Sequence, residues 1–101
     1  MKISKDVIET FRLICKGEKN TPEKDIVFKI NRNFTLGKVV ATLGKDTYIK
    51  QYGNFKMLYY KGKIINIYHD KSAKPIKASN EDKYAYNELN GRSDLNAKCS
   101  R

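Results

Sequence analysis

Residues 46–71 alternate apolar and polar side chains in short runs, DTYIKQYGNFKMLYYKGKIINIYHDK. A period of two is typical of β-strands, because successive side chains of a strand point to opposite faces of the sheet. Turn residues separate these runs at positions 53–54 (Gly-Asn) and 61–62 (Lys-Gly), and positions 44–45 (Gly-Lys) follow a β-branched run over residues 38–43. The spacing predicts strands joined by short hairpin loops, which is an antiparallel β-meander.

Helical spacing occurs near both ends of the chain. Apolar residues of segment 4–17, SKDVIETFRLICKG, recur every three or four positions, and Ser4 is a candidate N-cap. Near the C-terminus, Ser79 and Asp82 resemble a capping box ahead of EDKYAYNEL, and residues 90–91 (Asn-Gly) are suited to ending a helix. The sequence therefore predicts one helix before the meander and one after it.

A further strand is predicted over residues 25–31, where Ile26, Phe28 and Ile30 occupy alternate positions. With this strand the predicted fold class is α+β: an N-terminal helix packed on a roughly five-stranded antiparallel β-meander, with a short C-terminal helix.

The length of 101 residues predicts a single α+β domain, placed over residues 1–90. Residues 71–79 are polar and contain a proline, which indicates a surface linker to the C-terminal helix. Residues 91–101 are predicted to be a flexible basic tail.

Two-residue hairpin loops would pair Tyr52 with Phe55 and Tyr60 with Lys63, and this register assigns each residue to a face of the sheet. We expect the N-terminal helix to pack on the aliphatic face, which holds Thr47, Ile49, Gln51, Lys56, Leu58, Tyr60, Lys63, Ile65, Ile67 and His69. The aromatic face holds Tyr48, Lys50, Tyr52, Phe55, Met57, Tyr59, Ile64, Asn66 and Tyr68.

The aromatic face has two interpretations. Exposed tyrosines can stack on bases while neighbouring lysines bind phosphates, which makes the face a platform for nucleic acid. Alternatively, the C-terminal helix covers the face through Tyr84, Tyr86 and Leu89, since tyrosines commonly lie half-buried with the hydroxyl at the rim. The sequence leaves both open.

The charge of the chain favours a polyanionic partner. There are 21 basic and 11 acidic residues, giving a formal net charge of +10, and residues 25–71 hold nine basic residues against three acidic ones. Lysine dominates, and a point charge suits phosphate contacts, whereas bidentate base reading favours arginine. A compositional bias toward Lys, Ile, Asn and Tyr would produce the same enrichment without any function. The predicted nucleic-acid-binding residues are Tyr48, Lys50, Tyr52, Lys56, Tyr59, Lys61, Lys63 and Tyr68.

Cofactor and metal sites are not expected. The chain has one histidine, and Cys15 and Cys99 lie too far apart in sequence for metal-ligand spacing. A disulfide framework, a signal peptide and a membrane-spanning segment are not expected either, so the predicted location is the cytoplasm. The expected partner is RNA or DNA, or a protein that processes nucleic acid, and the aromatic face is also a possible homodimer contact.

No catalytic set is recognised in the sequence. His69 is a candidate for general acid–base chemistry beside carboxylates such as Asp70 and Glu9, although a lone histidine at the end of a strand is more often an ordinary polar residue. Residues 53–56 (Gly-Asn-Phe-Lys) and 64–71, with His69 and Lys71, resemble the C-terminal meander of the RelE/ParE toxin superfamily. The resemblance covers about a quarter of the chain. It implies a metal-independent ribonuclease, but that superfamily has a strand and a helical hairpin before the meander, and usually arginines within it.

Three functions therefore remain for the chain. The first is a small basic nucleic-acid-binding protein that contacts the backbone through a lysine and tyrosine sheet surface. The second is an inhibitor or accessory protein, of the type found in phages and mobile elements, that binds a nucleic-acid-processing enzyme. The third is a metal-independent ribonuclease of toxin type.

Overall fold

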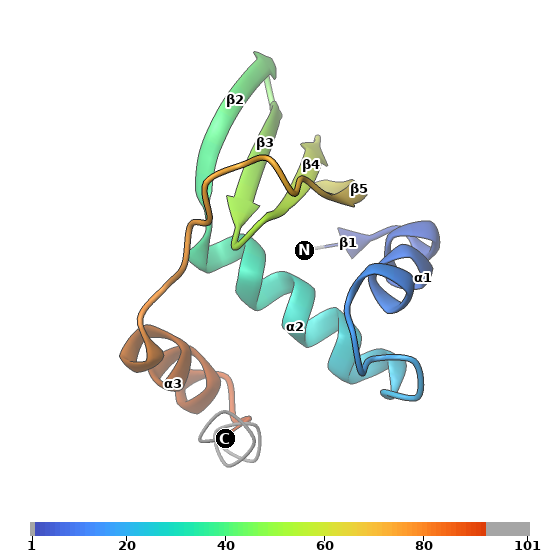
Figure 1. The fold of residues 1–101 in the computed structure, drawn as a ribbon, viewed down its shortest axis with the longest axis vertical. Helices are drawn as coiled ribbons and strands as arrows, with labels where there is room; N and C mark the ends of the chain where they lie inside the picture. Colours follow the sequence, from blue (N-terminus) through green and yellow to red (C-terminus); the bar gives the residue numbers. More distant parts are fainter. Residues whose placement is uncertain (1, 93–101) are drawn as a thin grey trace.

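The computed structural model describes residues 2–92 and shows an α+β fold, with three helices and a five-stranded sheet (Figure 1). In chain order, the elements are β1 Lys2–Ile3, α1 Lys5–Ile14, α2 Glu23–Leu36, β2 Lys38–Gly44, β3 Thr47–Tyr52, β4 Phe55–Tyr60, β5 Lys63–His69 and α3 Asn80–Leu89. Residues 93–101 of the predicted flexible basic tail lie outside the described part of the chain.

The sheet has the strand order β1-β5-β4-β3-β2. Strands β2 to β5 form the predicted antiparallel meander, with Tyr52 opposite Phe55 and Tyr60 opposite Lys63 as the hairpin loops require. The first hairpin loop is Lys45-Asp46, one residue later than predicted, and Asp46 has a positive φ of 58°. The remaining strand, β1, pairs with β5 in parallel and was not predicted.

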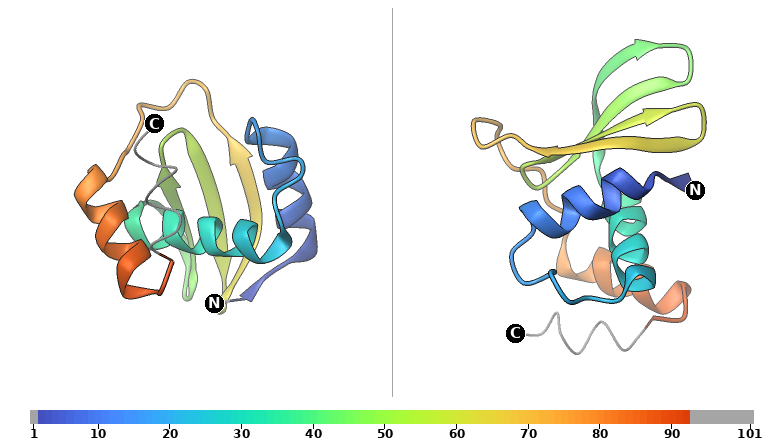
Figure 2. Two further views of the ribbon diagram at one scale, coloured as in Figure 1. Left: turned by 90° about the horizontal axis from the view of Figure 1, so that it is seen from below. Right: turned by 90° about the vertical axis from the view of Figure 1, so that its right-hand side faces the viewer.

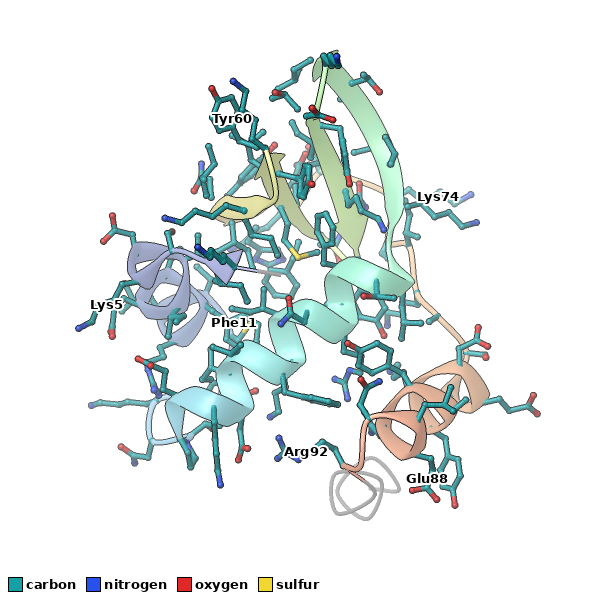
Figure 3. The ribbon with its side chains drawn as sticks, turned by 180° about the vertical axis from the view of Figure 1, so that it is seen from behind. Lys5, Phe11, Tyr60, Lys74, Glu88 and Arg92 are labelled. Carbon is teal, nitrogen blue, oxygen red and sulfur yellow. The ribbon has the colours of Figure 1, made fainter. Side chains whose placement is uncertain are left out.

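Helix α1 begins at the predicted N-cap. The Ser4 hydroxyl accepts a hydrogen bond from the Val7 amide at 3.3 Å, which satisfies one of the free amides of the first turn. The apolar stripe of the helix is buried through Val7, Ile8 and Phe11. Figure 3 shows Phe11 directed between α1 and α2.

Residues 25–31 are not a strand, and this prediction was wrong. They lie within α2, whose buried residues Ile26, Ile30 and Phe34 are four positions apart and form one stripe. A seven-residue window fits an alternating pattern as well as a helical one, and only the extension to Phe34 separates the two. Consequently, two helices precede the meander rather than one.

Both α1 and α2 pack on one face of the sheet, and this face is the aromatic one rather than the aliphatic one (Figure 2). The hydrophobic core consists of Val7, Ile8, Phe11, Ile26, Ile30, Phe34, Met57, Ile64 and Ile67. Tyr48, Tyr52 and Tyr59 are partly buried against this core. The Phe34 ring lies 6.1 Å from the Tyr48 ring and 5.7 Å from the Tyr59 ring, so α2 covers the tyrosines.

A β-bulge in β5 changes the predicted face of the second half of that strand. Tyr59 pairs with Ile64, but Leu58 pairs with Asn66, so Ile65 is the extra residue. Beyond the bulge the alternation is inverted: Ile67 is buried beside Met57, and Tyr68 lies on the opposite face. The two-residue hairpin loops fix the register only where the strands begin, so they could not predict a change of face that arises within the strand.

Helix α3 begins at Ser79, as predicted, with the Ser79 hydroxyl accepting a hydrogen bond from the Asp82 amide at 3.1 Å. The helix packs against α2, where the Phe28 and Tyr86 rings are 5.5 Å apart, and it approaches the tyrosines of the sheet at Tyr52, whose ring centre lies 6.0 Å from the Lys83 ammonium. Tyr84 and Leu89, the other residues predicted to make that contact, are 55% and 87% exposed.

Candidate nucleic-acid interface

One face of the sheet has no helix of residues 2–92 over it (Figure 2). The strand register places every second residue on this side, opposite the buried ones. We call it the open face, and it comprises Lys2, Lys38, Ala41, Thr47, Ile49, Gln51, Lys56, Leu58, Tyr60, Lys63, Asn66 and Tyr68. Tyr60 and Tyr68 are 44% and 38% exposed, and Figure 3 shows Tyr60 on the side of the sheet away from the helices.

The charge of the protein is concentrated in the layer that contains the open face. Residues 38–78, which hold the meander and the linker, carry nine lysines and two acidic residues, an excess of +7 out of the total of +10. Residues 1–37, which form most of the helical layer, carry eight basic and five acidic residues. The meander and linker therefore carry more than twice the net positive charge of the segment that precedes them, and Lys38, Lys56 and Lys63 of this set lie on the open face itself.

Two lysines lie directly opposite each other on the open face. Lys2 of β1 pairs with Lys63 of β5, and neighbouring strands are only about 4.8 Å apart. Tyr60 pairs with Lys63 from the other side, and the Lys61 ammonium lies 5.3 Å from the Tyr60 ring centre. Like charges in opposed positions repel each other, and a bound anion would remove this cost.

The other end of the open face is closed by the linker. The Gln51 side-chain amide donates hydrogen bonds of 2.8 Å to the Gly53 and Lys74 carbonyls, and Gln51 is only 3% exposed. Ile76 forms an isolated bridge with Gly53, and the Asn54 side chain donates to the Ala73 carbonyl at 2.7 Å. The linker is thus attached to the sheet and limits the accessible surface to the part between Tyr68 and Tyr60.

Lys56 is paired within the protein. Its ammonium donates to the Asp70 carboxylate at 2.8 Å, and the Ser72 hydroxyl donates to the same carboxylate at 2.7 Å. The hydrogen bonds from Lys56 and Ser72 lower the pKa of Asp70 from 3.8 to about 2, and the bond to Asp70 raises the pKa of Lys56. Lys56 is therefore less available to an external anion than Lys2, Lys38 or Lys63.

The Asp70 interaction has a measurable pH dependence. Because the pKa of Asp70 is lower in the folded protein than in the unfolded chain, its contribution to stability is complete above about pH 4 and is lost as the pH falls toward 2. We expect a carboxyl carbon NMR titration of Asp70 with a midpoint near pH 2, moving toward 3.8 in Lys56→Met. A midpoint near 3.8 in the unsubstituted protein would contradict the pairing.

The predicted nucleic-acid-binding residues are divided between the two faces. Lys56, Lys63 and Tyr68 lie on the open face, and Lys61 lies in the adjoining turn. The other four lie on the side covered by α2: Tyr48, Lys50, Tyr52 and Tyr59. The Lys50 ammonium is 4.7 Å from the Phe34 ring centre, and burial lowers its pKa.

Sequence reasoning omitted three residues of the open face that have exposed cationic or aromatic side chains. Tyr60 and Lys38 lie in strands that were predicted, and Tyr60 was assigned to the face expected to hold the helix. Lys2 was omitted because β1 has only two residues and too little pattern to reveal a strand. The omission of Tyr60 thus follows from its face assignment, and that of Lys2 from the unpredicted strand.

His69 and Cys15 lie in different surroundings. His69 is exposed at the end of β5, and its ring lies 4.8 Å from the Phe55 ring. Burial, with a smaller contribution from Glu18, raises the pKa of the Cys15 thiol to about 12, so that it is not ionised near neutral pH. Among residues 2–92, no group of three or more His, Cys, Asp and Glu side chains is arranged to hold a metal ion.

No helix in the described range 2–92 combines the length and apolar character needed to cross a bilayer. Comparison with curated proteins finds no significant match, and comparison with solved structures finds none either. A model of the YorE family, in contrast, matches residues 1–92, which include every helix and strand described above. Since the match extends over most of the chain, the protein belongs to the YorE family.

Proposed function

We propose that this protein binds nucleic acid through the open face of its sheet. The observation that carries the proposal is the concentration of charge in one layer: an excess of +7 over residues 38–78, on the layer whose outer face has no helix of the described chain over it. A flat surface of this kind matches a repeating array of phosphates, and phosphate contacts supply most of the affinity of non-specific nucleic-acid binding.

Lysine supplies the whole of the positive charge in this layer, since residues 38–78 contain no arginine. Bidentate contacts to guanine in the major groove are made best by arginine. We therefore propose contacts to the phosphate backbone, with little discrimination between sequences.

Binding to labelled 20-nucleotide RNA and DNA, measured by fluorescence anisotropy at several salt concentrations, tests the proposal. With about three to five phosphate contacts, the slope of log K against log salt should be about −2 to −3.5 for a single strand. Absence of binding at low salt would overturn the proposal. A slope near zero would show that phosphates do not provide the affinity.

A toxin-type ribonuclease is a second candidate, favoured by the order of the elements. A strand and two helices, β1, α1 and α2, precede the meander, which is the arrangement the RelE/ParE resemblance implies. Running the recovered RNA on a gel in the binding experiment tests this candidate. RNA that is shortened by the unsubstituted protein but stays intact with His69→Ala would support it. RNA that stays intact with the unsubstituted protein would exclude the ribonuclease and leave binding as the proposed function.

An accessory role toward a nucleic-acid-processing protein is compatible with membership of the phage-associated YorE family. The feature suited to a protein contact is strand β2, which lies at the edge of the sheet with Val39, Val40 and Leu43 54%, 42% and 60% exposed. Binding to an enzyme through this edge, without binding to nucleic acid at low salt, would favour the accessory role over the first proposal.

A further inference from the structure

We infer that the open face is built for single-stranded rather than double-stranded nucleic acid, with Tyr60 and Tyr68 stacking on unpaired bases. The inference rests on the proposed function and specifies its ligand. It is carried by the juxtaposition of exposed tyrosines, a row of apolar residues and opposed lysines on the same face of the sheet.

The two tyrosines occupy opposite ends of the open face. Tyr60 ends β4, and Tyr68 of β5 pairs with Lys56, which lies four positions before Tyr60. With about 3.3 Å per residue along a strand, the two positions are separated by roughly 13 Å along the strand direction. They therefore provide two separate stacking positions for one strand of nucleic acid that crosses β4 and β5.

Each tyrosine lies beside a lysine of the same face. Tyr60 is opposite Lys63, whose other neighbour is Lys2, and Tyr68 is opposite Lys56. A base stacked on Tyr60 would place its phosphate within reach of the opposed lysines, where a negative charge relieves their repulsion. Lys56 is bound to Asp70, so the net positive charge beside Tyr68 is smaller than the net positive charge beside Tyr60.

The surface between the tyrosines is mainly apolar. Ala41, Ile49 and Leu58 form one cross-strand row through the middle of the open face, and the polar Asn66 ends this row on β5, where its side-chain oxygen accepts a hydrogen bond from the Ile67 amide. A duplex presents phosphates and sugars to a flat sheet, and these gain nothing from contact with Ile49 and Leu58. Bases of a single strand are free to turn toward the protein, and they are attracted by both the apolar row and the exposed rings.

Affinity for a single-stranded 20-mer and for its blunt duplex, measured at one low salt concentration, tests the inference. The single strand should bind about 10-fold more tightly than the duplex. Tyr60→Ala combined with Tyr68→Ala should weaken single-strand binding by about 30-fold or more and change duplex binding by less than about twofold. Tyr60→Phe with Tyr68→Phe retains both ring faces and should bind as the unsubstituted protein does.

Tyr84→Ala is the matched control, because Tyr84 is 55% exposed but lies on α3. Its affinity for the single strand should be unchanged. If the double alanine variant does not fold, the leucine substitutions at the same positions retain apolar area without an aromatic ring and should show the same loss. Duplex binding that equals single-strand binding, with no effect of the tyrosine substitutions, would overturn the inference and leave the proposed function intact. Absence of binding to both ligands would overturn the proposed function itself.

Discussion

Replacing Phe34 with alanine is expected to lower the free energy of unfolding by about 3–5 kcal/mol. Phe34 is 3% exposed and contacts the rings of Tyr48 and Tyr59 as well as the Lys50 ammonium. Its removal leaves a cavity between α2 and the sheet, in addition to the lost burial of the ring. Since a domain of this size has a total stability of about 5–15 kcal/mol, urea denaturation should show a large fall in the transition midpoint.

Leu13→Ala provides the control for this prediction. Leu13 is 85% exposed on α1, and its substitution should change stability by no more than about 0.5 kcal/mol. A cost below about 1 kcal/mol for Phe34→Ala would contradict the packing of α2 on the tyrosines. The aromatic face would then be accessible, as the first interpretation of the sequence supposed.

Reversing the charge of Lys2 and Lys63 together is expected to have the largest effect on nucleic-acid binding. Lys2→Glu with Lys63→Glu removes two cations from the open face and introduces two repulsive charges, so affinity at low salt should fall by about 100-fold. The slope of log K against log salt should become smaller in magnitude by about 1.4 for a single strand. Like charges remain opposed in this variant, so the stability should change little.

Lys19→Glu with Lys24→Glu makes the same change in net charge on the helical side of the molecule. Both lysines are exposed, and Lys24 belongs to α2. Affinity should fall by less than about threefold. Equal losses in the two double variants would show that only the net charge matters, and the open face would have no special role.

Lys63→Glu alone separates binding from stability. It places a carboxylate opposite Lys2, which should raise the free energy of unfolding by a few tenths of a kcal/mol and nevertheless weaken binding. The loss of affinity would then not be attributable to unfolding.

The sequence predicts the meander well because strands β3, β4 and β5 have alternating patterns and two-residue turns that agree with each other. The N-caps of α1 and α3, Ser4 and Ser79, are also local features and were predicted. The strand predicted over residues 25–31 failed because its alternating apolar residues also belong to a longer helical stripe. The local pattern does not determine whether the strand period of two or the helical period of 3.6 prevails when the segment packs on a sheet.

The candidate site was harder to predict than the fold, because it depends on which face of the sheet the helices cover. Either face of the meander has enough apolar surface to accept a helix, and the choice is made by tertiary contacts such as those of Phe34 with Tyr48 and Tyr59. The bulge at Ile65 then moves Tyr68 to the open face. Neither contact nor bulge has a signal in the local sequence, so the sequence alone does not show that Tyr48, Tyr52 and Tyr59 lie under α2 and that Tyr68 lies on the open face.

The bulge also affects how β5 can change during evolution. Ile64 and Ile67 both reach the core although they are three positions apart, an odd spacing that only the extra residue allows. Loss of Ile65 itself would restore plain alternation and leave Ile64 and Ile67 on the core face, so the bulge can be removed without exchanging the faces of the strand. A deletion elsewhere in β5, or a second insertion, would instead exchange core and surface in one half of the strand. The bulge is therefore the place at which β5 can lose a residue and keep its faces.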